Sequence, residues 1–186
     1  SLMNILDIGA THLDKIILFQ VAGPVEVARY TFATLIPEQL RNVLKYIPTL
    51  SMPIFSELSP KVAKLKGLFL VKKLFLITIP FVIFYIIIAP MVYKILFPSY
   101  AEVVLYSQMF ALMLIFDGGI SGTILKAQNQ VKSLYWINTT SNTIKIIMLF
   151  ILGYIWGIWG VIVSRIISRI VGFLIAYICV QKMPTE

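Results

Sequence analysis

Cationic side chains lie inside stretches of this sequence that are otherwise apolar. Arg41 and Lys45 are four residues apart, as are Arg165 and Arg169, so each pair shares one face of a helix. Such groups bind phosphate, pyrophosphate or carboxylate when water or a ligand reaches them. The six cations inside apolar stretches are Lys15, Arg41, Lys45, Lys145, Arg165 and Arg169.

Two explanations account for these cations. A cation near the centre of a bilayer costs roughly 2.5 to 3.5 kcal/mol on insertion scales, so six of them cannot all face lipid. Either each is paired with an acid, as Glu38 with Arg41, and holds helices together, or the set lines a wet cavity. The clearly internal acids are only Asp14, Glu38 and Asp117. The positive excess favours a cavity that takes an anionic ligand.

Polar residues accompany one of the cations. Asn138 and Asn142 continue the helix face of Lys145, within the polar run 138–143. We expect them to line the cavity rather than only to form hydrogen bonds between helices. The predicted substrate-binding residues are Arg41, Lys45, Asn138, Asn142, Lys145, Arg165 and Arg169.

A second group suggests ion coupling. His12 and Asp14 are two residues apart in the first apolar stretch, and Asp117 lies in a later one. Such groups relay protons or bind a coupling cation in secondary transporters. The alternative is a structural hydrogen bond near a helix end. A membrane-embedded enzyme using these residues is disfavoured, because no loop is long enough to form a donor-binding domain, and we expect no catalytic residue.

Composition defines the class. Hydrophobic residues make up 59% of the 186 and charged residues 13%, against roughly 25% charged in a typical soluble domain. A polytopic helical membrane protein fits. The net charge of +8 is spread between apolar segments, so we expect no nucleic-acid partner. One cysteine and one histidine exclude a disulfide framework and a multi-histidine metal site, and no cofactor is expected.

The apolar pattern predicts an all-α fold, a single six-helix lobe. The stretch from Leu74 to Tyr93 has 20 residues without a charge, enough for a helix to cross roughly 30 Å of hydrocarbon. Gly23-Pro24 ends the first span, and the long second one should bend. The five lysines of segment 60–73, with apolar residues between them, predict a basic amphipathic segment that lies on the cytoplasmic leaflet. The expected spans are 4–22, 25–59, 74–97, 99–125, 134–153 and 158–181.

The distribution of basic residues predicts orientation, because cytoplasmic loops carry an excess of lysine and arginine. External turns have only Arg29 and Lys94 nearby. Both termini are therefore expected in the cytoplasm. The basic residues assigned to cytoplasmic segments are Lys61, Lys64, Lys66, Lys72, Lys73, Lys126, Lys132 and Lys182.

Short motifs then suggest a family. They are Asp14-Lys15-Ile-Ile-Leu, Ala22-Gly23-Pro24, Val27-Ala28-Arg29-Tyr30, Leu96-Phe97-Pro98-Ser99-Tyr100, Leu125-Lys126-Ala127-Gln128-Asn129-Gln130 and Gly157-Ile158-Trp159-Gly160-Val161. In this order and spacing the chain resembles the O-antigen and polysaccharide repeat-unit flippases of the multidrug, oligosaccharidyl-lipid and polysaccharide exporter superfamily. It departs from them at Arg29, where they usually carry glycine.

The resemblance implies a C-terminal lobe, since family members have two lobes. The partner lobe is then missing from this sequence or supplied by a second chain. It also implies alternating access: a central cavity moves an undecaprenyl-pyrophosphate-linked oligosaccharide, as in lipopolysaccharide synthesis, across the inner (cytoplasmic) membrane. Two alternatives stay open. One is a cation-coupled multidrug exporter of the multidrug and toxin extrusion type, which an acid-lined cavity would favour. The other is an inactive half-transporter or structural membrane subunit.

Overall fold

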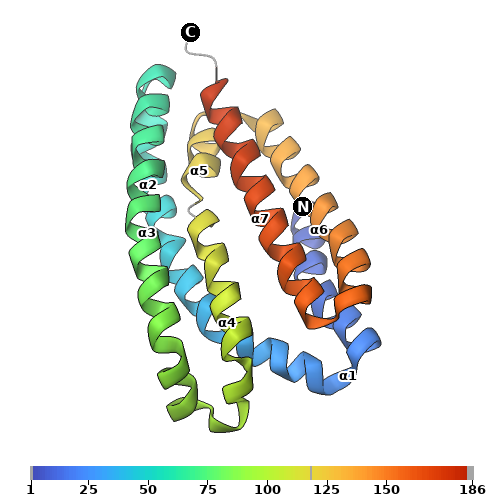
Figure 1. Cartoon of the computed structure of the whole chain (residues 1–186). Helices are drawn as coiled ribbons and strands as arrows, with labels where there is room; N and C mark the ends of the chain where they lie inside the picture. Colours follow the sequence, from blue (N-terminus) through green and yellow to red (C-terminus); the bar gives the residue numbers. More distant parts are fainter. Residues whose placement is uncertain (1, 118, 184–186) are drawn as a thin grey trace.

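A computed structural model describes residues 2–117 and 119–183, with side chains from Leu13 onward (Figure 1). Every element in this part of the chain is helical, which confirms the all-α prediction. The elements are α1 (Leu2–Leu44), α2 (Tyr46–Glu57), α3 (Pro60–Leu96), the 3₁₀ helix η1 (Pro98–Val103), α4 (Val104–Ala111), the 3₁₀ helix η2 (Leu112–Phe116), α5 (Ile120–Ala127), α6 (Val131–Trp156) and α7 (Ile158–Gln181).

Four helical stretches are long and apolar enough to cross a membrane: Pro60–Leu96, Pro98–Ala127, Val131–Trp156 and Ile158–Gln181. They correspond to the last four predicted spans, and they define a helical membrane protein. The first two predicted spans, 4–22 and 25–59, stay predictions, as does the six-helix count. In Figure 1 the turn from α3 to α4 lies at one end of the bundle, and α5 and the end of α7 lie toward the other.

Helix α1 changes direction at Gly23, where the sequence predicts a break (Figure 1). Gly23 has φ +83°, a backbone conformation that residues with a Cβ rarely adopt. The predicted long helix 25–59 is likewise interrupted, because α1 ends at Leu44 and α2 begins at Tyr46. Two helical segments therefore lead up to α3 instead of one.

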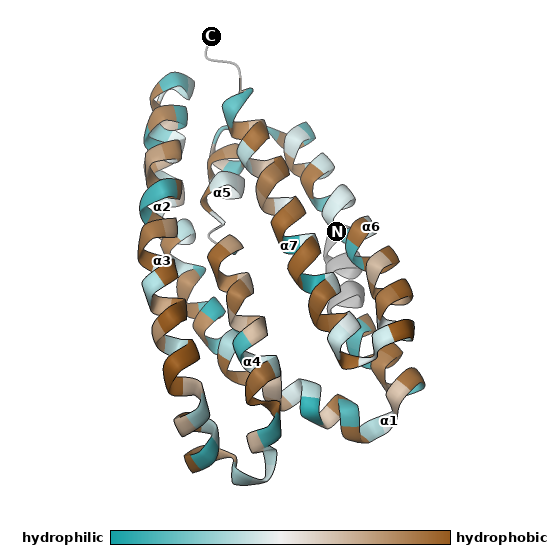
Figure 2. Ribbon diagram, in the orientation of Figure 1, coloured by the Kyte–Doolittle hydropathy of each residue, from teal (hydrophilic) through white to brown (hydrophobic). Residues whose placement is uncertain are grey.

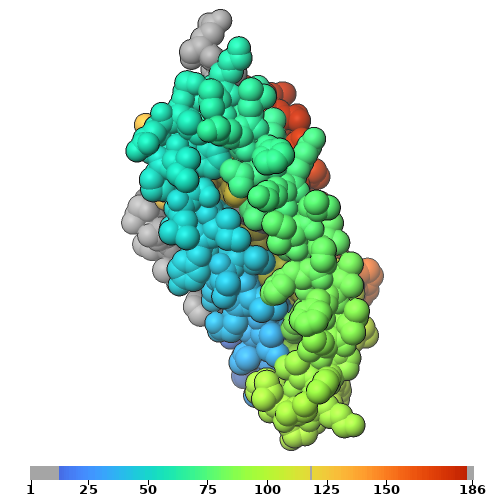
Figure 3. Space-filling model, turned by 90° about the vertical axis from the view of Figure 1, so that its left-hand side faces the viewer, coloured from blue at the N-terminus to red at the C-terminus, as the bar shows by residue number. Residues whose placement is uncertain are grey.

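Segment 60–73 is continuous with the span that follows it. Pro60 begins α3, where a missing N–H costs no hydrogen bond, and the single helix runs on to Leu96. Lys61, Lys72 and Lys73 are exposed on it. Figure 3 shows α3 alongside α1 and α2 on this face of the molecule, and Val82, Tyr85 and Ala89 of α3 form a buried cluster against Ile36 and Leu40 of α1.

Prolines within the helices are compensated by neighbouring side chains. Pro90 leaves the Ile86 carbonyl without its helical donor, and Gln108 Nε2 of α4 donates to that oxygen at 2.8 Å. The Tyr93 hydroxyl lies 2.8 Å from the Phe32 carbonyl oxygen and 3.4 Å from that of Ala33, which Pro37 frees. These contacts join α3 to α4 and α1 within an apolar setting.

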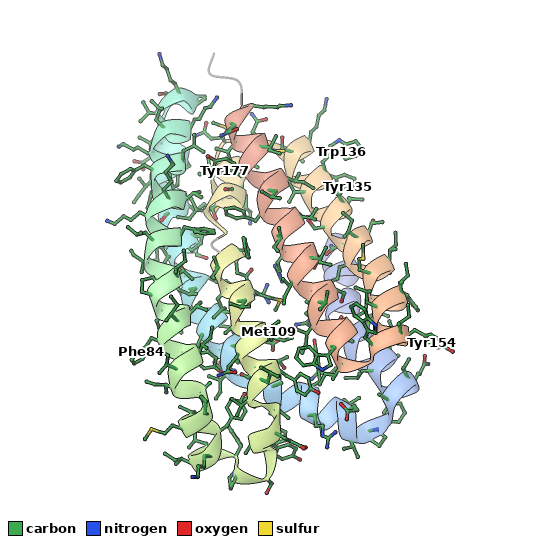
Figure 4. The ribbon with its side chains drawn as sticks, in the orientation of Figure 1. Phe84, Met109, Tyr135, Trp136, Tyr154 and Tyr177 are labelled. Carbon is green, nitrogen blue, oxygen red and sulfur yellow. The ribbon has the colours of Figure 1, made fainter. Side chains whose placement is uncertain are left out.

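Helices α6 and α7 form a tight hairpin. Gly157 makes the turn with φ +55°, and a Cβ at Gly160 would collide with the Leu152 carbonyl group. Most of the outer surface is apolar (Figure 2). Phe84 on α3 and Tyr135, Trp136 and Tyr154 on α6 point away from the bundle (Figure 4), as lipid-facing side chains do. Polar residues inside this bundle are costly to bury, so their positions are the ones that require a structural or functional explanation.

Candidate functional site

A cavity of about 340 Å³ lies between α3, α6, α7 and the η2–α5 junction, a name used here for Asp117 and Gly119 between those two helices. Arg41 of α1 also contributes to the cavity wall. Six of the seven predicted binding residues line it: Arg41, Asn138, Asn142, Lys145, Arg165 and Arg169. Helix α1 and the α6–α7 hairpin, which are distant in sequence, thus bring their cations to one place. Lys45, the seventh, is exposed at the turn between α1 and α2 and does not line the cavity.

The first group of charges is the Asp14 cluster, formed by Asp14, Tyr30, Glu38, Lys145 and Arg165. Arg165 Nε donates to Asp14 Oδ2, and its Nη1 lies 3.2 Å from Glu38 Oε1. Lys145 Nζ is 3.6 Å from Asp14 Oδ1. The Tyr30 hydroxyl donates to Asp14 Oδ2 at 3.0 Å. One fully buried carboxylate therefore joins α1, α6 and α7.

Aromatic rings close the Asp14 cluster. The guanidinium carbon of Arg165 lies 5.7 Å from the Tyr30 ring centre and 5.3 Å from that of Phe110. Both distances suit cation–π attraction. The two rings also pack edge to face, with centres 5.8 Å apart. Arg165 is 8% exposed and Asp14 0%. This arrangement removes the ion pair from solvent on the side facing α4.

The second group is the Asp117 cluster, formed by Asp117, Arg41 and Arg169. Asp117 Oδ2 pairs with Arg41 Nε, and Asp117 Oδ1 lies 3.2 Å from Arg169 Nη1. The Asp117 side chain is 8% exposed, that of Arg41 18% and that of Arg169 42%. All three residues line the cavity. These arginines are therefore within reach of anything that enters it.

The pairing differs from the example the sequence offered. Glu38 pairs with Arg165 of α7, and Arg41 pairs with Asp117. Glu38 and Arg41 are neighbours on α1, but longer-range partners from α7 and the η2–α5 junction take their place. Cations of the two clusters outnumber the carboxylates, with Arg41, Lys145, Arg165 and Arg169 against Asp14, Glu38 and Asp117. Both sequence explanations thus apply to the residues that the structure describes: the charges are paired, and the two clusters contain one more cation than carboxylates.

Polar groups without charge complete the wall. Buried Ser121 Oγ of α5 and Ser141 Oγ of α6 have no hydrogen-bond partner among the described residues. A buried hydroxyl left without a partner costs about 1 to 3 kcal/mol, so these groups favour an occupant such as a ligand or water. Asn138, Asn142, Thr78 and Ser168 line the same space.

Three phenylalanines form an aromatic part of the cavity wall. The Phe75 ring centre lies 5.8 Å from that of Phe116 and 5.7 Å from that of Phe173, which are themselves 5.9 Å apart. These rings come from α3, η2 and α7 and line the wall with Ile120. The cavity wall therefore combines charged, polar and apolar side chains.

Sequence reasoning missed Thr78, Ser121 and the phenylalanines. Thr78 is the one threonine of the apolar stretch 74–93, but its place on the inner face depends on how α3 is rotated, which the sequence does not show. Of the ion-coupling candidates, Asp14 belongs to the sealed cluster and Asp117 to the cavity wall. The His12 side chain lies outside the described residues. Within the described part of the chain, no three His, Cys, Asp or Glu side chains gather into a metal-binding group.

Comparison of the chain with protein-family models, with curated proteins and with solved structures found no match. The fold and site define a class, a helical membrane protein with an ionic cavity between its helices. Function has to be argued from that cavity.

Proposed function

We propose that this chain is one lobe of a membrane transporter that moves an anionic, lipid-linked oligosaccharide across the cytoplasmic membrane. One observation carries the proposal. Four cations gather around a cavity inside an apolar bundle, and the described part of the chain sets three carboxylates against them. An anionic ligand would neutralise the excess, which is costly to leave in a low-dielectric setting.

The composition of the wall supports a ligand with three kinds of group. Guanidinium groups at Arg41 and Arg169 suit a phosphate or pyrophosphate, which they contact through paired N–H groups. Serine hydroxyls and asparagine amides suit the hydroxyls of a sugar. The phenylalanines suit an apolar portion. A polyprenyl pyrophosphate carrying a sugar has all three.

The transport step requires no covalent chemistry from these residues. Cations bind the pyrophosphate on one side of the membrane, and a change of conformation opens the cavity to the other side. We propose that a second lobe, from the same protein or another chain, forms the opposite wall and that both termini lie in the cytoplasm. The alternative of a cation-coupled drug exporter is less well supported, because the excess charge of this wall repels cationic drugs.

Export in cells tests the proposal. The chain would be placed in its full transporter, in a strain whose surface polysaccharide depends on it. Arg169→Gln and Arg41→Gln should abolish export, because each removes a cation from the wall, while Lys73→Gln is the matched control on the exposed face of α3. Surface polysaccharide and membrane insertion would both be measured. Normal export by both cavity variants would contradict the proposal and favour a structural subunit.

A further inference from the structure

Asp117 is shared between two arginines that come from different parts of the chain. Each carboxylate oxygen faces one of them, Oδ2 toward Arg41 of α1 and Oδ1 toward Arg169 of α7. A carboxylate in this position does what one phosphate group of a ligand would do, since it bridges two guanidinium groups. The chain's own acid therefore occupies the position where the cavity is best suited to bind an anion.

The backbone around Asp117 interrupts the fourth apolar stretch. Helix η2 ends at Phe116, and α5 begins at Ile120 after Gly119, which has φ +53°. A Cβ at Gly119 would lie 3.3 Å from Pro48 Cγ of α2, tighter than an ordinary contact. The ion pairs of Asp117 thus tie this junction to α1 and α7. Because Asp117 directly follows η2, loss of its ion pairs frees the end of that helix from α1 and α7.

Asp14 shows what a purely structural acid looks like in the same bundle. Asp14 is fully buried and accepts a hydrogen bond from the Tyr30 hydroxyl. Its partner Arg165 packs against the rings of Tyr30 and Phe110. Asp117 lines the cavity, and Arg169 beside it is 42% exposed. An anion entering the cavity reaches Arg169 and Asp117, whereas the Asp14 carboxylate does not line the cavity. A phosphate carries more charge and more acceptor oxygens than a carboxylate, so it competes for the same two arginines.

We propose that Asp117 is a resident anion that holds the phosphate-binding position between Arg41 and Arg169. A phosphate or pyrophosphate group of the ligand displaces it, and the displacement releases the η2–α5 junction from α1 and α7. This inference rests on the proposed function, because it assumes an anionic ligand. It adds that binding is coupled to a conformational change through one carboxylate.

Binding to the purified chain in nanodiscs tests the displacement. The probes are inorganic pyrophosphate and, separately, a short-chain polyprenyl pyrophosphate. Removing the competing charge with Asp117→Asn should tighten binding about tenfold, or roughly 1.4 kcal/mol. Asp117→Glu keeps the carboxylate and should bind like the unaltered chain. Glu26→Gln, which removes a charge from an ion pair with Arg29 outside the cavity, is the matched control.

Amide hydrogen exchange of residues 112–127 tests the release without relying on a variant. Pyrophosphate should accelerate exchange there in the unaltered chain, and Asp117→Asn should show faster exchange before any ligand is added. The inference is overturned if Asp117→Asn binds neither probe more tightly than Glu26→Gln does. It is equally overturned if neither probe changes exchange in the unaltered chain.

The outcomes separate this inference from the proposed function. If the unaltered chain binds pyrophosphate and Arg169→Gln does not, but Asp117→Asn has no effect, then the anion site stands and the role of Asp117 is overturned. If neither the unaltered chain nor any variant binds either probe, this inference and the proposed function are both overturned. Tightening by Asp117→Asn for both probes supports displacement by the phosphate group alone. Tightening only for the polyprenyl probe supports displacement by a lipid headgroup.

Discussion

Arg165 and Arg169 lie one turn apart on α7, and each pairs with a carboxylate, yet the two pairs sit in different surroundings. Arg165 pairs with Asp14 and packs against two aromatic rings, and both charged groups are almost completely buried. Arg169 pairs with Asp117 at the wall of a cavity, with 42% of its own side chain exposed. The same residue type at helical spacing therefore lies in two settings, one buried against aromatic rings and one partly exposed at a cavity wall.

Solvent explains the difference. Separating a buried ion pair leaves an uncompensated charge in a medium that solvates it poorly, which is strongly destabilising. A partly exposed pair contributes little to stability, because water replaces either partner at small cost. Substitutions in the Asp14 cluster should accordingly affect folding, and substitutions in the Asp117 cluster should affect ligand binding.

The largest effect is expected from Arg165→Gln. This change leaves the Asp14 carboxylate buried without its main cationic partner, so the free energy of unfolding should fall by about 3 to 5 kcal/mol. Denaturant titration in detergent, followed by circular dichroism, measures it. A loss below about 1 kcal/mol would show that Lys145 and Tyr30 are enough to stabilise the buried Asp14 carboxylate. The Arg165 and Arg169 variants would then not differ in their effect on stability.

Arg169→Gln should separate stability from binding. Because the side chain is partly exposed, unfolding should change by about 1 kcal/mol or less, while binding of inorganic pyrophosphate should be lost. The same titration and a calorimetric binding measurement check both expectations. Equal destabilisation by Arg165→Gln and Arg169→Gln would contradict the division into two roles.

Tyr30→Phe removes one hydrogen bond from the Asp14 cluster and keeps the ring that packs on Phe110. We expect a loss of about 1 to 2 kcal/mol in unfolding free energy, because the lost donor served a buried carboxylate. Tyr154→Phe, on the exposed surface of α6, is the control and should have no comparable effect. If the two variants are equally stable, Asp14 does not depend on Tyr30.

The smallest effect is expected for Arg29, which pairs with Glu26 at 2.5 Å and with Glu102 at 2.8 Å outside the cavity. Because these ion pairs are partly exposed, Arg29→Gln should leave both the unfolding midpoint and pyrophosphate binding unchanged. The measurement sets the baseline for the other variants. A loss of binding here would place the anion site elsewhere in the molecule.

Sequence reasoning recovered the features that depend on local pattern. The break at Gly23 follows from a glycine beside a proline, and the predicted span 158–181 matches α7 because Gly157 precedes it and apolar residues continue on both sides of Arg165 and Arg169. The gathering of Arg41, Lys145 and Arg169 followed from a cost argument, since cations within apolar stretches avoid lipid. These arguments need only neighbours along the chain or the chemistry of the bilayer.

Sequence could not provide the features that depend on how helices are rotated and which ones meet. Asp117 pairs with Arg169, 52 residues away, and no local spacing indicates it. Small residues such as Gly119 and Gly122 often mark close helix packing, yet α5 begins only after Gly119, and a Cβ at Gly122 would meet nothing within 4 Å. Arg165 and Arg169 looked equivalent because their difference arises from Tyr30 and Phe110 on other helices.

The central claim is that water reaches the cavity wall beside Arg169 but not the buried interior of the Asp14 cluster. Ser168 and Ser164 on α7 are a matched pair: each hydroxyl donates to the carbonyl three residues earlier, but only Ser168 lines the cavity. Single cysteines would replace them in a Cys179→Ser background, and a charged, membrane-impermeant thiol reagent would be applied to intact and opened vesicles. We predict labelling of Ser168→Cys and protection of Ser164→Cys. Protection of both cysteines would contradict a hydrated cavity. The paired charges would then serve only to join the helices.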